Sequence, residues 1–254
     1  MIFNGGPVVV GHRGFGAAKP GGYRENTMRS YLAAVEHGLS WIELDVQRSL
    51  DGQLVIRHDP VTASGDFVVT RSADELAAAG IMRFDDVMAA LPAEVALIID
   101  VKTIMEDAVD PPHLRTAALV CEALRKHAGR RRMLVSSFDP ALLLYLKDHG
   151  HASPEVPLGL IAWPNFPNWQ AVTVAANLGL NVISVHTSSF GLHRERPRVT
   201  DRPTEQVIGV AHQAGLEVLA WSPGPADAIR LAAAGADALC VDDIPGVLGA
   251  LASR

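Results

Sequence analysis

The stretch WIELDVQRSLDGQLVIRH, residues 41–58, carries the pattern that decides the fold. Two runs typical of β-strands, residues 41–47 and 54–58, flank a short join. That join, residues 47–52, is too short for a crossover helix, and its Asp51-Gly52 pair is typical of a tight reversal. We therefore expect the second run to lie antiparallel to the first, as an excursion from the main sheet.

Outward from this hairpin, strand-like runs alternate with helix-like stretches. Residues 27–37 show the apolar spacing of a helix, with Asn26 or Thr27 available to cap its start. The other strand candidates are residues 8–10, 96–101, 133–137, 158–163, 182–186, 218–221 and 238–241. Such alternation predicts parallel strands joined by right-handed crossovers, in an open doubly wound sheet or a closed barrel.

Counting the strand candidates favours the barrel. Nine candidates less the one excursion leave eight, and the 254 residues match the roughly 250 that a (β/α)8 barrel needs. No linker or low-complexity stretch divides the chain. We predict an α/β fold, a (β/α)8 TIM barrel, with residues 1–254 as a single domain.

Composition excludes several classes of protein. The chain has 22 Lys plus Arg against 28 Asp plus Glu, a net charge of −6, which argues against a nucleic-acid-coating protein. Two cysteines are too few for a disulfide framework. No apolar run reaches the ~18 residues of a transmembrane segment, and no secretory signal precedes Arg13. We expect a cytoplasmic protein.

The first long strand carries charge on one face. Ile42, Leu44 and Val46 share one side of it, while Glu43 and Asp45 share the other. Strands of a parallel barrel are covered on both faces, so the apolar side should meet the helices. We therefore expect the two carboxylates to point into the mouth of the barrel, about 7 Å apart along the strand.

Further polar residues follow the same rule at other strand ends. Asp100 and Lys102 share a face of the strand at residues 96–101, and His12 with Arg13 directly follows the first strand. Barrel enzymes place their chemistry at this C-terminal face. Three buried carboxylates repel one another unless a cation lies among them, and oxygen ligands suit a hard divalent cation, Mg²⁺ or Ca²⁺.

A second histidine, His58, follows the excursion. Two histidines beside a hard metal suit phosphoryl chemistry, in which one takes a proton from the nucleophile and the other protonates the leaving oxygen. Arg13 can chelate a phosphate through two hydrogen bonds, and Lys102 can add a point charge. These residues alone predict a metal-assisted reaction on an anionic substrate.

In order and spacing, these motifs resemble the glycerophosphodiester phosphodiesterase family. The motifs are Gly11-His12-Arg13-Gly14, Glu25-Asn26-Thr27, Glu43-Leu44-Asp45-Val46, Asp51-Gly52 and His58-Asp59. The likeness continues through Asp100-Val101-Lys102, Ser136-Ser137-Phe138-Asp139, Ala220-Trp221 and residues 237–245. The resemblance implies a (β/α)8 barrel that hydrolyses glycerophosphodiesters to glycerol phosphate and an alcohol with a divalent cation.

The resemblance also implies roles by position. Glu43 and Asp45 would bind the metal, with Asp100 as third ligand, and His12 and His58 would form the acid–base pair. In the family's mechanism a glycerol hydroxyl attacks phosphorus, giving a cyclic phosphate that water opens.

Arg13 and Lys102 would hold the phosphate of a small-molecule or lipid-derived phosphodiester. Trp221 would form a wall for the alcohol part of the substrate.

The sequence departs from the family pattern at three places. Asp100 stands where the family usually has Glu, and Ser222-Pro223-Gly224 replaces its usual Thr-Val-Asn. The stretch from His58 to Asp100 is short, so we expect a reduced cap insertion after the third strand segment.

Two alternatives stay open at this point. One is a phospholipase D-like enzyme acting on lysophospholipids or sphingolipids, and the other is a barrel that binds a phosphodiester without turnover. The alcohol part of the substrate, the choice between Mg²⁺ and Ca²⁺, and the oligomeric state are left open.

Overall fold

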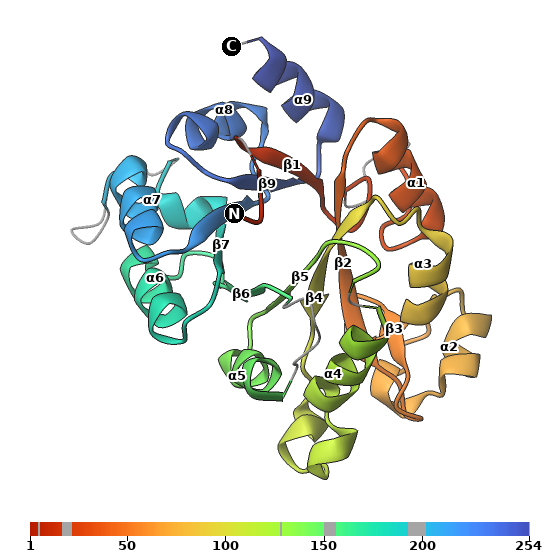
Figure 1. The fold of residues 1–254 in the computed structure, drawn as a ribbon. Coiled ribbons are helices and arrows are strands. Elements are labelled where there is room, and N and C mark those ends of the chain that lie inside the picture. The colour runs from red at the N-terminus through yellow and green to blue at the C-terminus, as the bar shows by residue number, and fades with distance from the viewer. Residues whose placement is uncertain (5, 17–21, 128, 150–155, 193–201, 254) are drawn as a thin grey trace.

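The computed structural model describes residues 1–4, 6–16, 22–127, 129–149, 156–192 and 202–253. Within these ranges nine strands form one sheet, which closes into a barrel because β1 pairs with both β2 and β9. The strands are β1 (Val8–Gly11), β2 (Trp41–Arg48), β3 (Leu54–Ile56), β4 (Ala96–Val101), β5 (Met133–Ser137), β6 (Leu158–Ile161), β7 (Val182–His186), β8 (Glu217–Trp221) and β9 (Ala238–Val241). All except β3 pair in parallel, which confirms the predicted (β/α)8 barrel (Figure 1).

Helices surround the barrel and connect successive strands (Figure 1). They are α1 (Met28–Glu36), α2 (Ala73–Ala78), α3 (Phe84–Ala90), α4 (Thr116–His127), α5 (Pro140–His149), α6 (Asn168–Asn177), α7 (Thr204–Gln213), α8 (Pro225–Ala233) and α9 (Ile244–Ala252). Short 3₁₀ turns are η1 (Val68–Thr70), η2 (Met105–Ala108), η3 (Pro112–Leu114) and η4 (Thr187–Phe190). Of the two residues predicted to cap α1, Thr27 does so by accepting a hydrogen bond from the backbone of Ser30.

The predicted excursion is confirmed. β3 lies antiparallel to β2, with Val46 opposite Ile56 and Arg48 opposite Leu54. β3 ends at Ile56 rather than at the predicted residue 58. The carbonyl oxygens of residues 57, 58 and 59 accept hydrogen bonds from the side-chain amide of Gln47 instead of from a strand. β6 ends at Ile161 rather than at the predicted residue 163, although the N–H of Ala162 still donates to the carbonyl of Ser184 on β7.

The two faces of β2 separate as its alternation predicts. Ile42, Leu44 and Val46 are fully buried in the core between barrel and helices. Trp41, on the face of Glu43, belongs instead to a second cluster inside the barrel. The carboxylates are therefore aimed at the barrel interior by the same period of two that buries their neighbours.

The connection from β3 to β4 is the place where we expected a reduced cap insertion. Residues 57–95 fold into η1, α2 and α3. A separate small core beside this connection holds the buried residues Val55 of β3, Val68, Ala73, Leu76 and Ile81. This segment brings Pro60, Phe67, Val69 and Thr70 to the mouth of the barrel.

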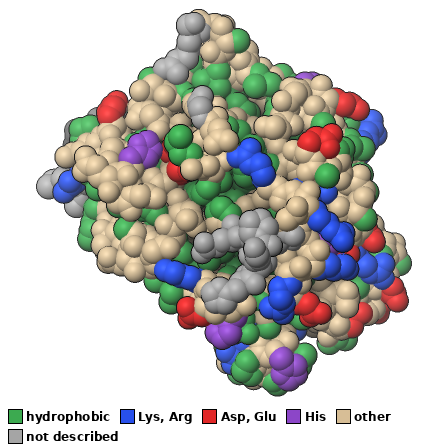
Figure 2. Space-filling model, viewed as in Figure 1, with side chains coloured by type: hydrophobic (Ala, Val, Ile, Leu, Met, Phe, Trp, Pro, Cys, Tyr) green, Lys and Arg blue, Asp and Glu red, His purple; other side chains and the backbone are tan. Residues whose placement is uncertain are grey.

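Two surface properties bear on partners. None of the helices in the described ranges has both the length and the apolar character that crossing a membrane requires. On the face seen in Figure 2, Lys and Arg side chains are interspersed with Asp and Glu, so neither sign forms a continuous field there.

Candidate active site

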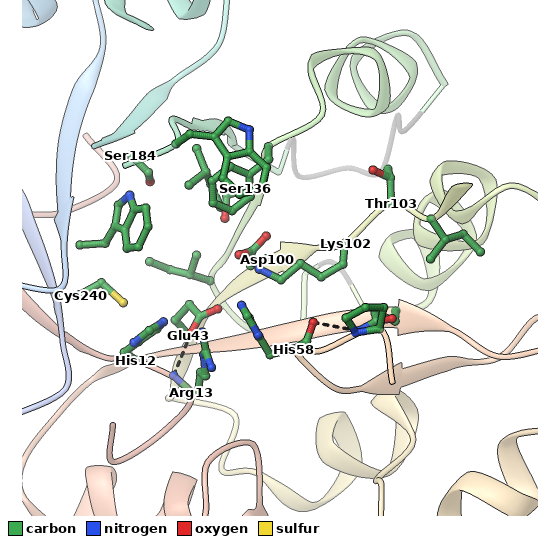
Figure 3. A pocket seen from close by; sticks show the side chains of 18 of the residues that line it. His12, Arg13, Glu43, His58, Asp100, Lys102, Thr103, Ser136, Ser184 and Cys240 are labelled. Carbon is green, nitrogen blue, oxygen red and sulfur yellow. Dashed lines mark hydrogen bonds and ion pairs between the residues drawn. The ribbon is translucent and has the colours of Figure 1, made fainter. Parts of the chain in front are cut away.

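A cavity of about 750 Å³ opens at the C-terminal ends of the barrel strands. Seven of the eight predicted site residues line it: His12, Arg13, Glu43, His58, Asp100, Lys102 and Trp221. The eighth, Asp45, lies behind them and is 1% exposed. Figure 3 shows the labelled side chains of His12, Glu43, His58, Asp100 and Lys102 directed toward one another.

Three carboxylates meet at the base of this cavity. β2 and β4 pair in register with Asp45 opposite Asp100, and Glu43 precedes Asp45 on the same face. One oxygen from each of Glu43, Asp45 and Asp100 lies within 4.8 Å of the others. All three side chains are buried, so the cluster concentrates negative charge where water cannot screen it.

This crowding shifts the carboxyl pKa values in different directions. Burial and the neighbouring Asp45 raise the pKa of Glu43 to about 8. Burial also raises the pKa of Asp100. Burial acts on Asp45 in the same sense, but the charges of Lys102 and Arg13 outweigh it and lower its pKa.

Two cations balance the cluster. Lys102 Nζ lies 3.0 Å from Asp45 Oδ1 and donates a short hydrogen bond to Asp100 Oδ2. Arg13 Nε lies 3.4 Å from Asp45 Oδ2, while its terminal nitrogen donates to both oxygens of Glu25. The predicted phosphate-holding side chains thus contact the carboxylates and also line the cavity.

The donor set fits a hard divalent cation. It consists of three buried carboxylates, and Asp100 Oδ1 is a buried acceptor without a hydrogen-bond partner in the described structure. An unpaired buried acceptor is costly in a protein interior, and a cation among the three groups would satisfy it. Asp100 therefore lies where a third ligand would be needed although its side chain is one methylene shorter than Glu.

Each predicted catalytic histidine is oriented by a carboxylate. His12 Nδ1 donates to Asp242 Oδ1 at 2.8 Å, and His58 Nδ1 donates to Asp59 Oδ1 at 2.8 Å. These bonds leave Nε2 of each ring available to the cavity that both rings line. Burial lowers the pKa of His12, but the hydrogen bond to Asp242 and the charge of Glu43 outweigh it and raise the pKa.

Asn26, which we expected only as a possible helix cap, is part of the site. Its side chain donates to Asp45 Oδ2 at 2.7 Å and accepts from the hydroxyl of the buried Tyr31 at 3.0 Å. Its backbone adopts a positive φ of 53°, which Asn tolerates better than most residues. Once Thr27 is identified as the cap, the position of Asn26 directly after Glu25 is the signal that it belongs to the site.

Gln47 was also missed. It shares the inward face of β2 with Glu43 and Asp45, and it is 2% exposed. Its Nε2 lies 2.9, 3.0 and 2.9 Å from the carbonyl oxygens of residues 57, 58 and 59. The period of two along β2 could have identified this residue.

Trp221, the last residue of β8, lies beside the rings of Phe138 and His186. Its ring lies 6.3 Å from that of Phe138 and 4.3 Å from the imidazole of His186. Trp221 Nε1 is buried and has no hydrogen-bond partner in the described structure. The residue therefore provides an apolar surface and one unpaired donor.

Comparison with known proteins agrees with this arrangement. The model of the glycerophosphoryl diester phosphodiesterase family matches residues 12–245. The chain is 26% identical over 234 residues to the "Probable glycerophosphodiester phosphodiesterase 1" of Mycobacterium tuberculosis, covering 81% of this chain and 80% of that protein.

Solved structures show the same fold. An Oleispira antarctica phosphodiesterase in complex with the product sn-glycerol-3-phosphate is 23% identical, with a TM-score of 0.75 over 97% of each chain. A Parabacteroides distasonis glycerophosphodiester phosphodiesterase is 18% identical, with a TM-score of 0.77 over 98% of each chain. With the family model matching nearly the whole length, the chain belongs to the glycerophosphoryl diester phosphodiesterase family and is a phosphoric diester hydrolase.

Proposed function

We propose that this protein hydrolyses glycerophosphodiesters to glycerol phosphate and an alcohol with the help of a divalent cation. The observation that carries the proposal is the buried carboxylate cluster flanked by two histidines, each oriented by its own carboxylate. The family assignment supports the reaction class, and the Oleispira relative with bound sn-glycerol-3-phosphate supports a small-molecule product. A single domain over residues 1–254 and a cytoplasmic location stay predictions.

Glu43, Asp45 and Asp100 would hold the cation, Mg²⁺ or Ca²⁺. When bound, such an ion supplies Lewis-acid stabilisation of negative charge on the phosphoryl oxygens. Arg13 and Lys102, which line the same cavity, would hold the phosphate by charge-assisted hydrogen bonds.

The two histidines would move the protons. The glycerol hydroxyl next to the phosphate attacks phosphorus and gives its proton to the Nε2 of one histidine. The P–O bond to the alcohol breaks, and the other histidine protonates the departing oxygen, leaving a cyclic phosphate. Water then opens the ring by the same transfers in reverse, which restores both histidines.

Single substitutions of the histidines test this mechanism. We expect His12→Ala and His58→Ala each to lower kcat at least a hundredfold, because general acid–base catalysis contributes about 10²–10⁴-fold. Circular dichroism should show an unchanged fold, since both side chains line a cavity rather than the core. Wild-type turnover in both variants would remove the proposed mechanism.

Product identity separates the alternatives. A phospholipase D-like enzyme would release a lipid phosphate or a cyclic lipid phosphate rather than glycerol phosphate. A barrel that only binds would take up metal and phosphodiester but form no product. The two oriented histidines favour an enzyme over the binding barrel, because binding alone needs no pair of positioned proton carriers.

A further inference from the structure

Uncharged donors hold two of the buried carboxylates in place. Glu43 Oε2 accepts a hydrogen bond from the backbone N–H of Arg13 at 2.8 Å. Asp45 Oδ2 accepts one from the side-chain amide of Asn26 at 2.7 Å. Partners of this kind fix the direction in which a metal-binding side chain points, and they influence metal affinity nearly as strongly as the ligands do.

Asn26 differs from the other partners of the Asp45 carboxylate. In the described part of the chain, the other two side chains paired with it are Arg13, with Nε at 3.4 Å, and Lys102, with Nζ at 3.0 Å. Both are cations that line the cavity and would hold the phosphate, so a bound phosphodiester competes with Asp45 for them. Asn26 carries no charge and is not among the described lining residues, so its bond to Asp45 persists when substrate binds.

The Asn26 amide can hold this carboxylate in one of its two orientations only. The two ends of an amide have nearly the same shape, but only the nitrogen can donate, so a half-turn would bring Oδ1 against the negative Asp45. A donor on the Oδ1 side opposes that turn. The hydroxyl of Tyr31 donates to Oδ1 at 3.0 Å, and the backbone N–H of Asp45 lies 3.4 Å from the same oxygen.

Tyr31 is held so that its hydroxyl stays a donor at this point. The residue lies on α1 and is fully buried in the core between the barrel and the helices. Packing therefore fixes the ring, and the hydroxyl is the part of the side chain that needs a hydrogen-bond partner. Burial and the charges of Glu43 and Asp45 raise the pKa of the phenol well above its usual value, so it keeps its proton.

We propose that Tyr31 is a positioning residue of the metal site, which acts through Asn26 to hold Asp45 in the orientation that a divalent cation requires. This inference rests on the proposed function, because it concerns the cation that the function needs. When Arg13 and Lys102 bind the phosphate, Asn26 keeps the carboxylate in place. Tyr31 in turn keeps the amide from turning. Loss of the one hydroxyl should therefore weaken cation binding although all three carboxylates remain.

Calorimetric titration with Mg²⁺ and with Ca²⁺ tests the proposal independently of turnover. Tyr31→Phe removes the hydroxyl and keeps the buried ring, and we expect the dissociation constant of the cation to rise about fivefold or more. Tyr145→Phe is the control, because Tyr145 packs against His149 on α5, outside the site, and should leave the constant unchanged. An unchanged constant in Tyr31→Phe would overturn this inference alone. A wild-type protein that binds neither cation would overturn the metal dependence of the proposed function as well.

A second variant shows whether Tyr31 acts through Asn26. Asn26→Gly removes the amide, and glycine readily adopts the positive φ of 53° found at this position. We expect Asn26→Gly to raise the dissociation constant about 10–100-fold, and Tyr31→Phe to change it by less than about twofold in that background. Unchanged affinity in Asn26→Gly, or an equal loss from Tyr31→Phe in both backgrounds, would contradict the proposed route.

Discussion

At the scale of single residues, Gln47 shows how one buried amide can fix a reacting group. Its Nε2 faces the carbonyls of three consecutive residues, with His58 in the middle. Two N–H bonds shared among three acceptors hold the backbone of this loop against β2. The His58 ring then needs only its bond to Asp59 to be oriented.

We therefore predict that Gln47→Met, which keeps the shape but removes the donors, lowers kcat about ten- to a hundredfold, since small misplacements of a reacting group cost about that much. Metal affinity, measured by calorimetry, should stay within about twofold. Gln53→Met is the control, because Gln53 is an exposed residue of the β2–β3 hairpin.

A double-mutant cycle separates positioning of His58 from general loosening of the fold. With a 4-nitrophenyl phosphodiester, whose good leaving group keeps residual turnover measurable, Gln47→Met should have little further effect in a His58→Ala background. Equal losses in both backgrounds would show that Gln47 does not act through His58.

At the scale of elements, the tight turn that directly follows β1 fixes the position of His12. A Cβ on Gly11 would lie 2.1 Å from the carbonyl oxygen of Gly14. Gly11 immediately precedes His12, and its carbonyl accepts a hydrogen bond from Gly14. The chain can therefore turn this closely only without a side chain at residue 11.

We predict that Gly11→Ala displaces the β1–α1 connection, lowers the urea midpoint and reduces kcat at least tenfold by moving His12. Gly209→Ala, in the middle of α7 with no atom within 4 Å of a Cβ, should instead raise the free energy of unfolding by about 0.5–1 kcal/mol. A Gly11→Ala protein with wild-type turnover would contradict the tight packing.

The elements were the most predictable part of the molecule. The period of two along β2 and the short Asp-Gly join gave the strand order near the site, because both depend on local spacing. Strand ends were less predictable: after β3 the side chain of Gln47, on the neighbouring strand β2, binds the next carbonyls, and this side-chain contact leaves no mark in the strand pattern. The orienting carboxylate Asp242 was missed as a partner of His12 because 230 residues separate them, and only barrel closure brings them together.

At the scale of the whole molecule, the carboxylate cluster couples folding to pH and metal. Glu43 has its pKa raised to about 8, so between its ordinary value and pH 8 the folded protein holds a proton that the unfolded chain releases. The raised pKa values of Asp100 and His12 act in the same sense. Without metal, these groups therefore make the folded state less stable as pH rises.

We predict that in EDTA the free energy of unfolding attributable to Glu43 falls by on the order of 1–3 kcal/mol from pH 5.5 to 8, a fraction of what its pKa shift allows. Saturating Mg²⁺ or Ca²⁺ should stabilise the protein more at pH 8 than at pH 5.5, since the cation displaces that proton. Urea unfolding of wild type and Glu43→Gln gives the difference. The same pH slope in both proteins would contradict this coupling.

The central claim is that the carboxylate cluster and two histidines form a metal-dependent phosphodiesterase site. Phosphorus NMR of the purified protein with glycerophosphocholine, in EDTA and then with Mg²⁺ or Ca²⁺, tests it most directly. We expect no conversion in EDTA and the formation of glycerol phosphate once either cation is added. Hydrolysis that continues unchanged after complete chelation, or none with any divalent cation, would contradict it.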